Sequence, residues 1–165
     1  LQPDVSKNGA VKTFFPSRRT SRRIGGYEMY KSFNVPGTPV GKGRPRFTKS
    51  GHAFTPEKTR SYESLVRSCY KQSCRGDKLS GALSVMITAY FPPLKSDSKR
   101  TWAQKESGQV LPVKKPDCDN IAKAILDALN GLAYDDDSQI VSAVILKKYG
   151  FPARVEVMLY EIKQE

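Results

Sequence analysis

Residues 114–140 read KKPDCDNIAKAILDALNGLAYDDDSQI, and we work outward from this stretch to the fold. It predicts a helix over residues 120–130, because apolar residues recur there at three- and four-residue spacing. The expected buried face comprises Ile121, Ile125, Ala128 and Leu129. Gly131 follows at a position where glycine commonly ends a helix. The predicted helix is flanked by acidic residues on both sides.

Extended segments are expected on both sides of this helix, because residues that favour strands gather there. They cover residues 27–35, 82–91, 140–149 and 154–162, with two short pieces at 44–48 and 53–55. We expect the last two long strands to pair with each other around Gly150, Phe151 and Pro152. A second helix is predicted over residues 56–73. Together these elements predict an α/β (α+β) domain with a small mixed sheet packed by two main helices.

The helix over residues 56–73 is expected to begin with Thr55 as its cap and Pro56 at its first position. Its predicted buried face comprises Tyr62, Leu65, Val66, Cys69 and Tyr70. Residues 1–26 are predicted to be a basic N-terminal arm, and residues 27–165 the folded domain. Within that domain, a long connection over residues 94–116 is expected to hold one short helix near 98–106.

The chain has 165 residues and a formal net charge of +12, but the charge is unevenly distributed. Residues 1–60 carry a net +10 and residues 61–116 a net +6, whereas residues 117–165 carry a net −4. This favours a protein that binds a polyanion and concentrates carboxylates where a metal sits; the alternative is a soluble protein with a charged surface. No apolar run is long enough for a membrane helix, and three cysteines without CxxC spacing fit a reducing cytoplasm. A single histidine argues against a zinc site.

The acidic residues around the 120–130 helix have two interpretations. Asp117 and Asp119 lie two residues apart before the helix, so in an extended approach both side chains point the same way. One of them can cap the helix, but capping does not require both. The three acids 135–137 either form a solvated turn or fold back to join the first pair around a cation. Oxygen-only ligands favour Mg²⁺ or Mn²⁺.

Lys123 lies four residues after Asp119 and four before Asp127, so the three share one helix face. They form either an ordinary ion-pair ladder or a group in which the Lys123 ammonium binds the scissile phosphate or steadies the attacking water. No nucleophile-elbow motif accompanies the single histidine, and the segment from Gly41 to Arg44 lacks P-loop spacing. No small-molecule cofactor is expected.

Two separate groups of residues form a recognisable pattern. The first is Lys115-Pro116-Asp117-x-Asp119-Asn120-x-x-Lys123-x-x-x-Asp127-Ala128-Leu129-Asn130-Gly131, followed by Asp136-Asp137-x-Gln139-Ile140. The second is Lys42-Gly43-Arg44-Pro45-Arg46, followed by Thr55-Pro56 and Thr59. Together, over roughly residues 28–162, they closely resemble the RusA family of Holliday junction resolvases, which phages and prophages often carry.

The resemblance implies a Mg²⁺-dependent homodimeric endonuclease that nicks four-way DNA junctions symmetrically, with Mn²⁺ as an expected substitute. The metal-binding acids it implies are Asp117, Asp119 and Asp137, with Asp136 assisting and Lys123 as the catalytic lysine. A two-fold dimer would place one site on each opposed strand of a junction.

The carboxylates repel DNA, so basic residues must outweigh them. Our candidates for phosphate contacts are Lys42, Arg44, Arg46, Lys114 and Lys115; the alternative is that these residues only keep the surface soluble. Two other functions stay open: a non-catalytic protein that binds branched DNA or RNA, and a magnesium-dependent nuclease for another branched substrate.

Overall fold

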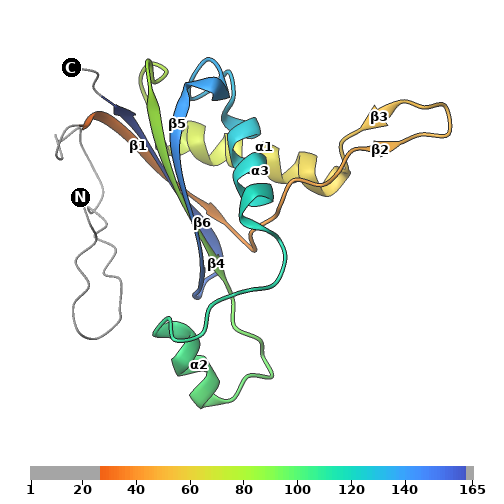
Figure 1. Cartoon of the computed structure of the whole chain (residues 1–165), viewed down its shortest axis with the longest axis vertical. Helices are drawn as coiled ribbons and strands as arrows, with labels where there is room; N and C mark the ends of the chain where they lie inside the picture. Colours follow the sequence, from red (N-terminus) through yellow and green to blue (C-terminus); the bar gives the residue numbers. More distant parts are fainter. Residues whose placement is uncertain (1–26, 163–165) are drawn as a thin grey trace.

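A four-stranded mixed sheet with helices against one face forms the body of the protein, as Figure 1 shows for the computed structural model, which describes residues 27–162. In chain order the elements are β1 (Tyr27–Pro36), β2 (Arg46–Phe47), β3 (Ala53–Phe54), α1 (Glu57–Ser73), β4 (Leu83–Phe91), α2 (Lys99–Glu106), α3 (Cys118–Leu129), a 3-10 turn (Asp137–Gln139), β5 (Ile140–Tyr149) and β6 (Arg154–Ile162). The predicted fold class is confirmed. The predicted arm 1–26 lies outside the described residues.

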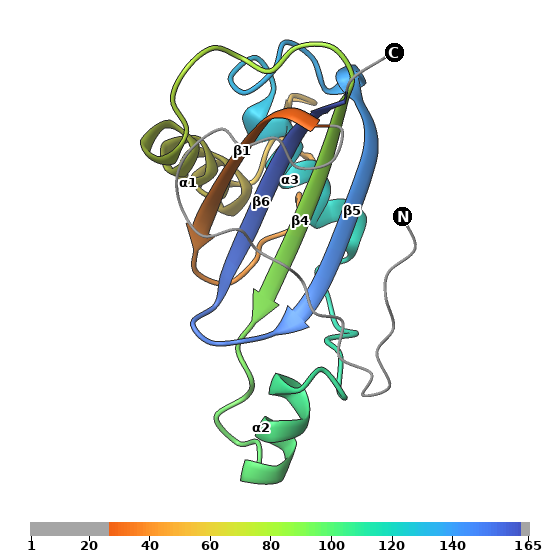
Figure 2. The ribbon, with the colours of Figure 1, turned by 90° about the vertical axis from the view of Figure 1, so that its left-hand side faces the viewer.

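The sheet order is β1-β6-β4-β5, in which only β4 and β5 run parallel (Figure 2). Alternate β4 residues, from Leu83 to Ala89, are fully buried beneath the helices, as expected for a strand with one face in the core. The residues predicted for the buried face of α3 are also fully buried. None of the helices within residues 27–162 is long and apolar enough to cross a bilayer.

The prediction that β5 and β6 pair with each other is wrong, because β4 lies between them. The short link between the two strands passes across the end of β4, where the Gly150 amide donates a hydrogen bond to the Phe91 carbonyl at 2.9 Å. A Cβ at position 150 would lie 2.7 Å from Tyr90 Cδ1, so the link needs a glycine to pass this close. A strand-turn-strand pattern does not reveal which strand lies between.

Two details of α1 also differ from the predictions. Pro56 occupies the N-cap position and the helix begins without a side-chain cap, so Thr55 does not cap it. Leu65 is 37% exposed, whereas Thr59 is 2% exposed and lies on the buried face. The buried face of α1 therefore excludes Leu65 and includes the polar Thr59. The segment after β1 packs at the start of α1, where the Thr59 hydroxyl accepts a hydrogen bond from the Gly43 amide.

The long connection contains the predicted short helix, α2. The Ser98 hydroxyl accepts a hydrogen bond from the Thr101 amide and caps it. An ion pair of 2.6 Å joins Lys105 Nζ to Asp97 Oδ2, and the same ammonium lies 4.5 Å from the centre of the Tyr149 ring at the end of β5. The contact with Tyr149 connects α2 to β5, and the ion pair with Asp97 holds the Lys105 side chain in place.

Candidate nuclease site

The site begins where the chain enters α3. Asp117 occupies the N-cap position of this helix, yet its side chain makes no capping hydrogen bond and is exposed. Capping therefore does not account for this carboxylate. Asp119 lies in the first helical turn and Lys123 one turn further, and both are exposed. The N-terminus of a helix favours negative charge, so Asp117 and Asp119 are stable there without a capping hydrogen bond.

A loop after β1, residues 37–45, docks directly on the start of α3. The Lys42 amide donates to the Asn120 carbonyl at 2.8 Å, and the Gly43 amide donates to the Thr59 hydroxyl at 3.1 Å. A Cβ at position 41 would lie 2.8 Å from Pro116 Cβ, so glycine allows this close approach. The two groups of motif residues, far apart in sequence, are therefore in contact.

An open cleft of about 850 Å³ lies between this loop, the start of α1 and the entry to α3. Its charged lining residues are Lys42, Arg44, Lys58, Lys115 and Asp117. Arg44, Lys58, Lys115 and Asp117 are exposed. The cleft thus combines one carboxylate with several cations, an arrangement that attracts a phosphate backbone to an acidic centre.

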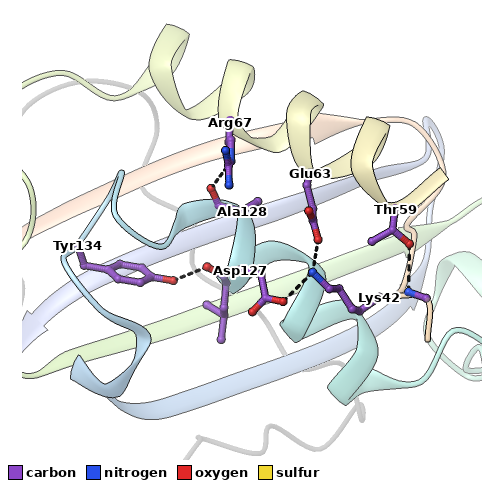
Figure 3. A network of polar contacts seen from close by, with 9 residues as sticks. Lys42, Thr59, Glu63, Arg67, Asp127, Ala128 and Tyr134 are labelled. Carbon is purple, nitrogen blue, oxygen red and sulfur yellow. Dashed lines mark hydrogen bonds and ion pairs between the residues drawn. The ribbon is translucent and has the colours of Figure 1, made fainter. Parts of the chain in front are cut away.

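Lys42 is held between the two main helices (Figure 3). Its ammonium forms ion pairs with Glu63 of α1 and, at 2.8 Å, with Asp127 Oδ2 of α3. Burial opposes the charge on Lys42, but hydrogen bonds and attraction from the two carboxylates outweigh it and raise its pKa. These ion pairs connect the loop to both main helices, and the contact of Lys42 with a DNA phosphate stays a prediction. Because Asp127 is used here and Lys123 makes no ion pair among residues 27–162, the ion-pair ladder predicted as one alternative does not form.

The three consecutive acids after α3 have different surroundings. Asp135 forms a 2.8 Å ion pair with Lys78. Asp136 caps the 3-10 turn by accepting the Ser138 amide at 2.8 Å, and the hydrogen bonds from Ser138 lower the pKa of Asp136. Asp137 begins the turn and is exposed. A 3-10 turn that begins at Asp137 therefore connects these acids to β5.

Tyr134 places the second acidic segment beside α3. This side chain is fully buried, and its hydroxyl donates to the Leu126 carbonyl at 2.9 Å (Figure 3). Burial is the main cause of its raised pKa, and the negative charges of Asp137, Asp127 and Asp136 add to the effect. The Tyr134 hydrogen bond therefore connects the start of the second acidic segment to α3. That this segment joins Asp117 and Asp119 around a cation stays a prediction.

The predicted metal ligands have suitable chemistry but do not form a complete group. Mg²⁺ prefers oxygen ligands, and Asp117, Asp119 and Asp137 are exposed carboxylates. Across residues 27–162, however, no three or more acidic, histidine or cysteine side chains are close enough together to hold a metal ion. The assignment of these acids as metal ligands stays a prediction.

The remaining predicted phosphate contacts have different positions. Arg44 and Lys115 line the cleft, and Lys114 is exposed next to it, with its carbonyl accepting a 2.5 Å hydrogen bond from Lys147 Nζ. The side chain of Arg46 lies outside the described residues. Sequence reasoning missed Lys58, Glu63 and Tyr134. Only Lys58 had a usable signal, as a basic residue beside the Thr55, Pro56 and Thr59 pattern. The other two act through contacts that only the fold reveals, Glu63 with Lys42 and Tyr134 with the Leu126 carbonyl.

Two comparisons relate the chain to known proteins. The family model for the endodeoxyribonuclease RusA matches residues 36–160, which include every residue of the cleft. The uncharacterized protein YqaN of Bacillus subtilis (strain 168) is 38% identical over 135 residues, covering 79% of this chain and 95% of that protein.

Proposed function

Because the chain belongs to the RusA family of endodeoxyribonucleases, we propose that it resolves four-way DNA junctions by paired, symmetric phosphodiester hydrolysis. Family membership itself makes the chain a DNA-cleaving hydrolase. The observation that carries the proposal is the cleft in which the loop after β1 meets the entry to α3. Arg44 of the loop, Lys58 of α1 and Lys115 before α3 would bind the DNA backbone next to Asp117.

In the proposed mechanism, Asp117, Asp119 and Asp137 would hold Mg²⁺, for which Mn²⁺ would substitute, and Asp136 would assist. A bound ion would make water a better nucleophile and offset charge on the phosphate oxygens. Asp136 has the secondary role because one of its oxygens already accepts the Ser138 amide. Lys123, exposed on the face of α3 that carries Asp119, would contact a non-bridging phosphate oxygen and stabilise the charge that develops there.

The other cleft residues would position the substrate. Arg44, Lys58 and Lys115 would bind phosphates on either side of the scissile bond. Lys42 would act as a positioning residue, because its two ion pairs keep the loop that carries Arg44 against α1 and α3.

We propose that the active form is a homodimer, because a four-way junction has two-fold symmetry and paired nicks need two sites. Sedimentation equilibrium of the full chain, with and without junction DNA, tests this directly. Two protomers per junction are expected, and a single protomer on each junction that is nicked symmetrically would contradict the dimer.

The activity test uses a labelled synthetic four-way junction with Mg²⁺, beside an EDTA control and a linear duplex. Paired nicks in the junction alone are expected. Asp119→Asn and Lys123→Met should each reduce nicking by at least ~100-fold while retaining junction binding. Asp135→Asn is the matched control, because Asp135 is an exposed acid of the same region that pairs with Lys78 outside the proposed site.

Tight junction binding without nicks in Mg²⁺ or Mn²⁺ would overturn the catalytic proposal and leave a protein that binds branched nucleic acid. Equal cleavage of junction, forked and linear DNA would instead indicate a less selective nuclease.

A further inference from the structure

The β2–β3 hairpin projects from the body of the protein beyond the helices (Figure 1). Its two strands pair Arg46 with Phe54 and Phe47 with Ala53. A tight turn closes the hairpin: the Thr48 amide donates to the His52 carbonyl at 2.9 Å, and Gly51 has a φ of 83°. An isolated two-stranded hairpin is marginally stable in water, so binding of a partner to its exposed surface would stabilise it.

Two aromatic side chains make this hairpin unusual. Phe47 is 72% exposed and Phe54 is 46% exposed. Residues directly opposite each other in a ladder share a face, and neighbours along a strand alternate. Because Phe47 is opposite Ala53 and Phe54 is opposite position 46, the two rings lie on opposite faces of the hairpin. The hairpin therefore presents one aromatic ring on each side.

The charge around the hairpin favours a polyanion as its partner. Residues 42–60 contain six Lys or Arg residues and one acid, Glu57. Among the described side chains, Arg44, Lys49 and Lys58 are exposed. Basic charge interleaved with exposed aromatic rings is the composition that binds nucleic-acid backbones and stacks on bases.

The hairpin also adjoins the proposed site. Pro45 and Pro56, at its two ends, both line the cleft with Asp117. Phe47 lies two residues after Pro45, and Phe54 lies two residues before Pro56. At ~3.3 Å per strand residue, each phenylalanine is about 7 Å along the chain from the cleft. That distance corresponds to roughly two base steps of ~3.4 Å along a DNA strand.

We propose that the β2–β3 hairpin inserts at the branch point of a DNA junction, where Phe47 and Phe54 stack on the bases at the ends of two adjoining arms. The inference rests on the proposed function and identifies how the substrate is recognised. A hairpin with a ring on each face fits a gap that has bases on both sides. In a continuous duplex that gap must be opened by unstacking, whereas a branch point supplies it. The hairpin therefore selects branched over linear DNA.

The experiment places 2-aminopurine at the branch point of a synthetic junction and measures its fluorescence and the affinity of the full-length protein in EDTA. Phe47→Ala, Phe54→Ala and the double variant are compared with wild type and with Phe47→Trp. The matched control is Phe151→Ala, because Phe151 is 73% exposed in the β5–β6 link. Circular dichroism melting checks that each variant folds.

We expect a fluorescence change on binding that is lost in the double variant, with junction affinity reduced about tenfold or more for each alanine. Affinity for linear duplex should change less than affinity for the junction. Phe47→Trp should retain the fluorescence change, because the ring is kept. Phe151→Ala should have the fluorescence change and the affinity of wild type. A double variant with wild-type fluorescence and junction preference overturns the inference. So does a loss of self-association without a change in DNA binding, which would identify the partner as a second copy.

The two proposals fail separately. If wild-type protein nicks junctions but the hairpin variants behave like it, only this inference is wrong. If wild type neither binds nor nicks junctions, the proposed function fails first.

Discussion

Lys42 illustrates how neighbouring residues determine the role of a single cation. Its sequence context predicts a DNA contact, and in the fold its ammonium also pairs with Glu63 and Asp127. Lys42→Met would leave two part-buried carboxylates without a counter-ion, at a cost of about 1–2 kcal/mol after allowance for their partial exposure. We expect urea denaturation to show this loss of unfolding free energy.

A triple variant tests whether the loss comes from the unpaired acids. Adding Glu63→Gln and Asp127→Asn to Lys42→Met removes those charges, so the triple variant should recover most of the stability. Lys58→Met is the control, because Lys58 is exposed in the same cleft and makes no ion pair among residues 27–162. A triple variant less stable than Lys42→Met would show that the charges are not the cause.

Tyr134 gives a second prediction at this scale. Tyr134→Phe removes the hydroxyl that donates to the Leu126 carbonyl and should cost about 1 kcal/mol of unfolding free energy. The pKa of Tyr134 is raised, chiefly by burial, so the protonated donor is the favoured form in the folded protein. The contribution should therefore be constant up to about pH 9 and decline only above the ordinary tyrosine pKa of about 10. Denaturation of both proteins at several pH values would reveal any earlier decline.

At the scale of elements, α2 depends on the pair formed by Asp97 and Lys105. The hydrogen bond from Lys105 is the main cause of the lowered pKa of Asp97. A carboxyl with a lowered pKa stabilises the folded state above its unfolded pKa of about 3.9, and this stabilisation is lost as the pH falls through the folded value. We expect α2 to be firmly docked above about pH 4 and to loosen below it.

Trp102, the single tryptophan of the chain, lies in α2 and reports this directly. Its fluorescence should shift between about pH 4 and pH 2 before the far-ultraviolet circular dichroism of the sheet changes. Asp97→Asn should show the shifted spectrum already at pH 7, whereas Glu106→Gln, an exposed acid of the same helix, should not. Identical acid transitions in wild type and Asp97→Asn would refute the role of the pair.

Elements with strong local patterns were predictable, whereas their neighbours in space were not. β4 and α3 follow from apolar periodicity, because one buried face imposes that spacing on the sequence. The position of β4 between β5 and β6 is a property of the whole sheet that a turn signal does not encode. In the site, motif spacing predicts roles for Asp117, Asp119 and Lys123 that stay predictions. It does not reveal the partners of Lys42, which come from two separate helices.

For the whole molecule, the excess of positive charge predicts a strong dependence of DNA binding on salt. Each phosphate that a Lys or Arg neutralises releases counter-ions, so the logarithm of the affinity falls linearly with the logarithm of salt concentration. If Arg44, Lys58 and Lys115 bind phosphates, replacing any one by alanine should reduce the magnitude of this slope by about one.

Position along one helix supplies the control for this test. Lys71 is an exposed lysine of α1, like Lys58, but lies thirteen residues further on, about 20 Å along the axis. Lys71→Ala should therefore leave the slope unchanged, while Lys58→Ala lowers it. Junction binding titrations across a range of KCl concentrations measure both slopes. If Lys58→Ala and Lys71→Ala reduce the slope equally, the cations act through net charge alone and the cleft does not direct the DNA.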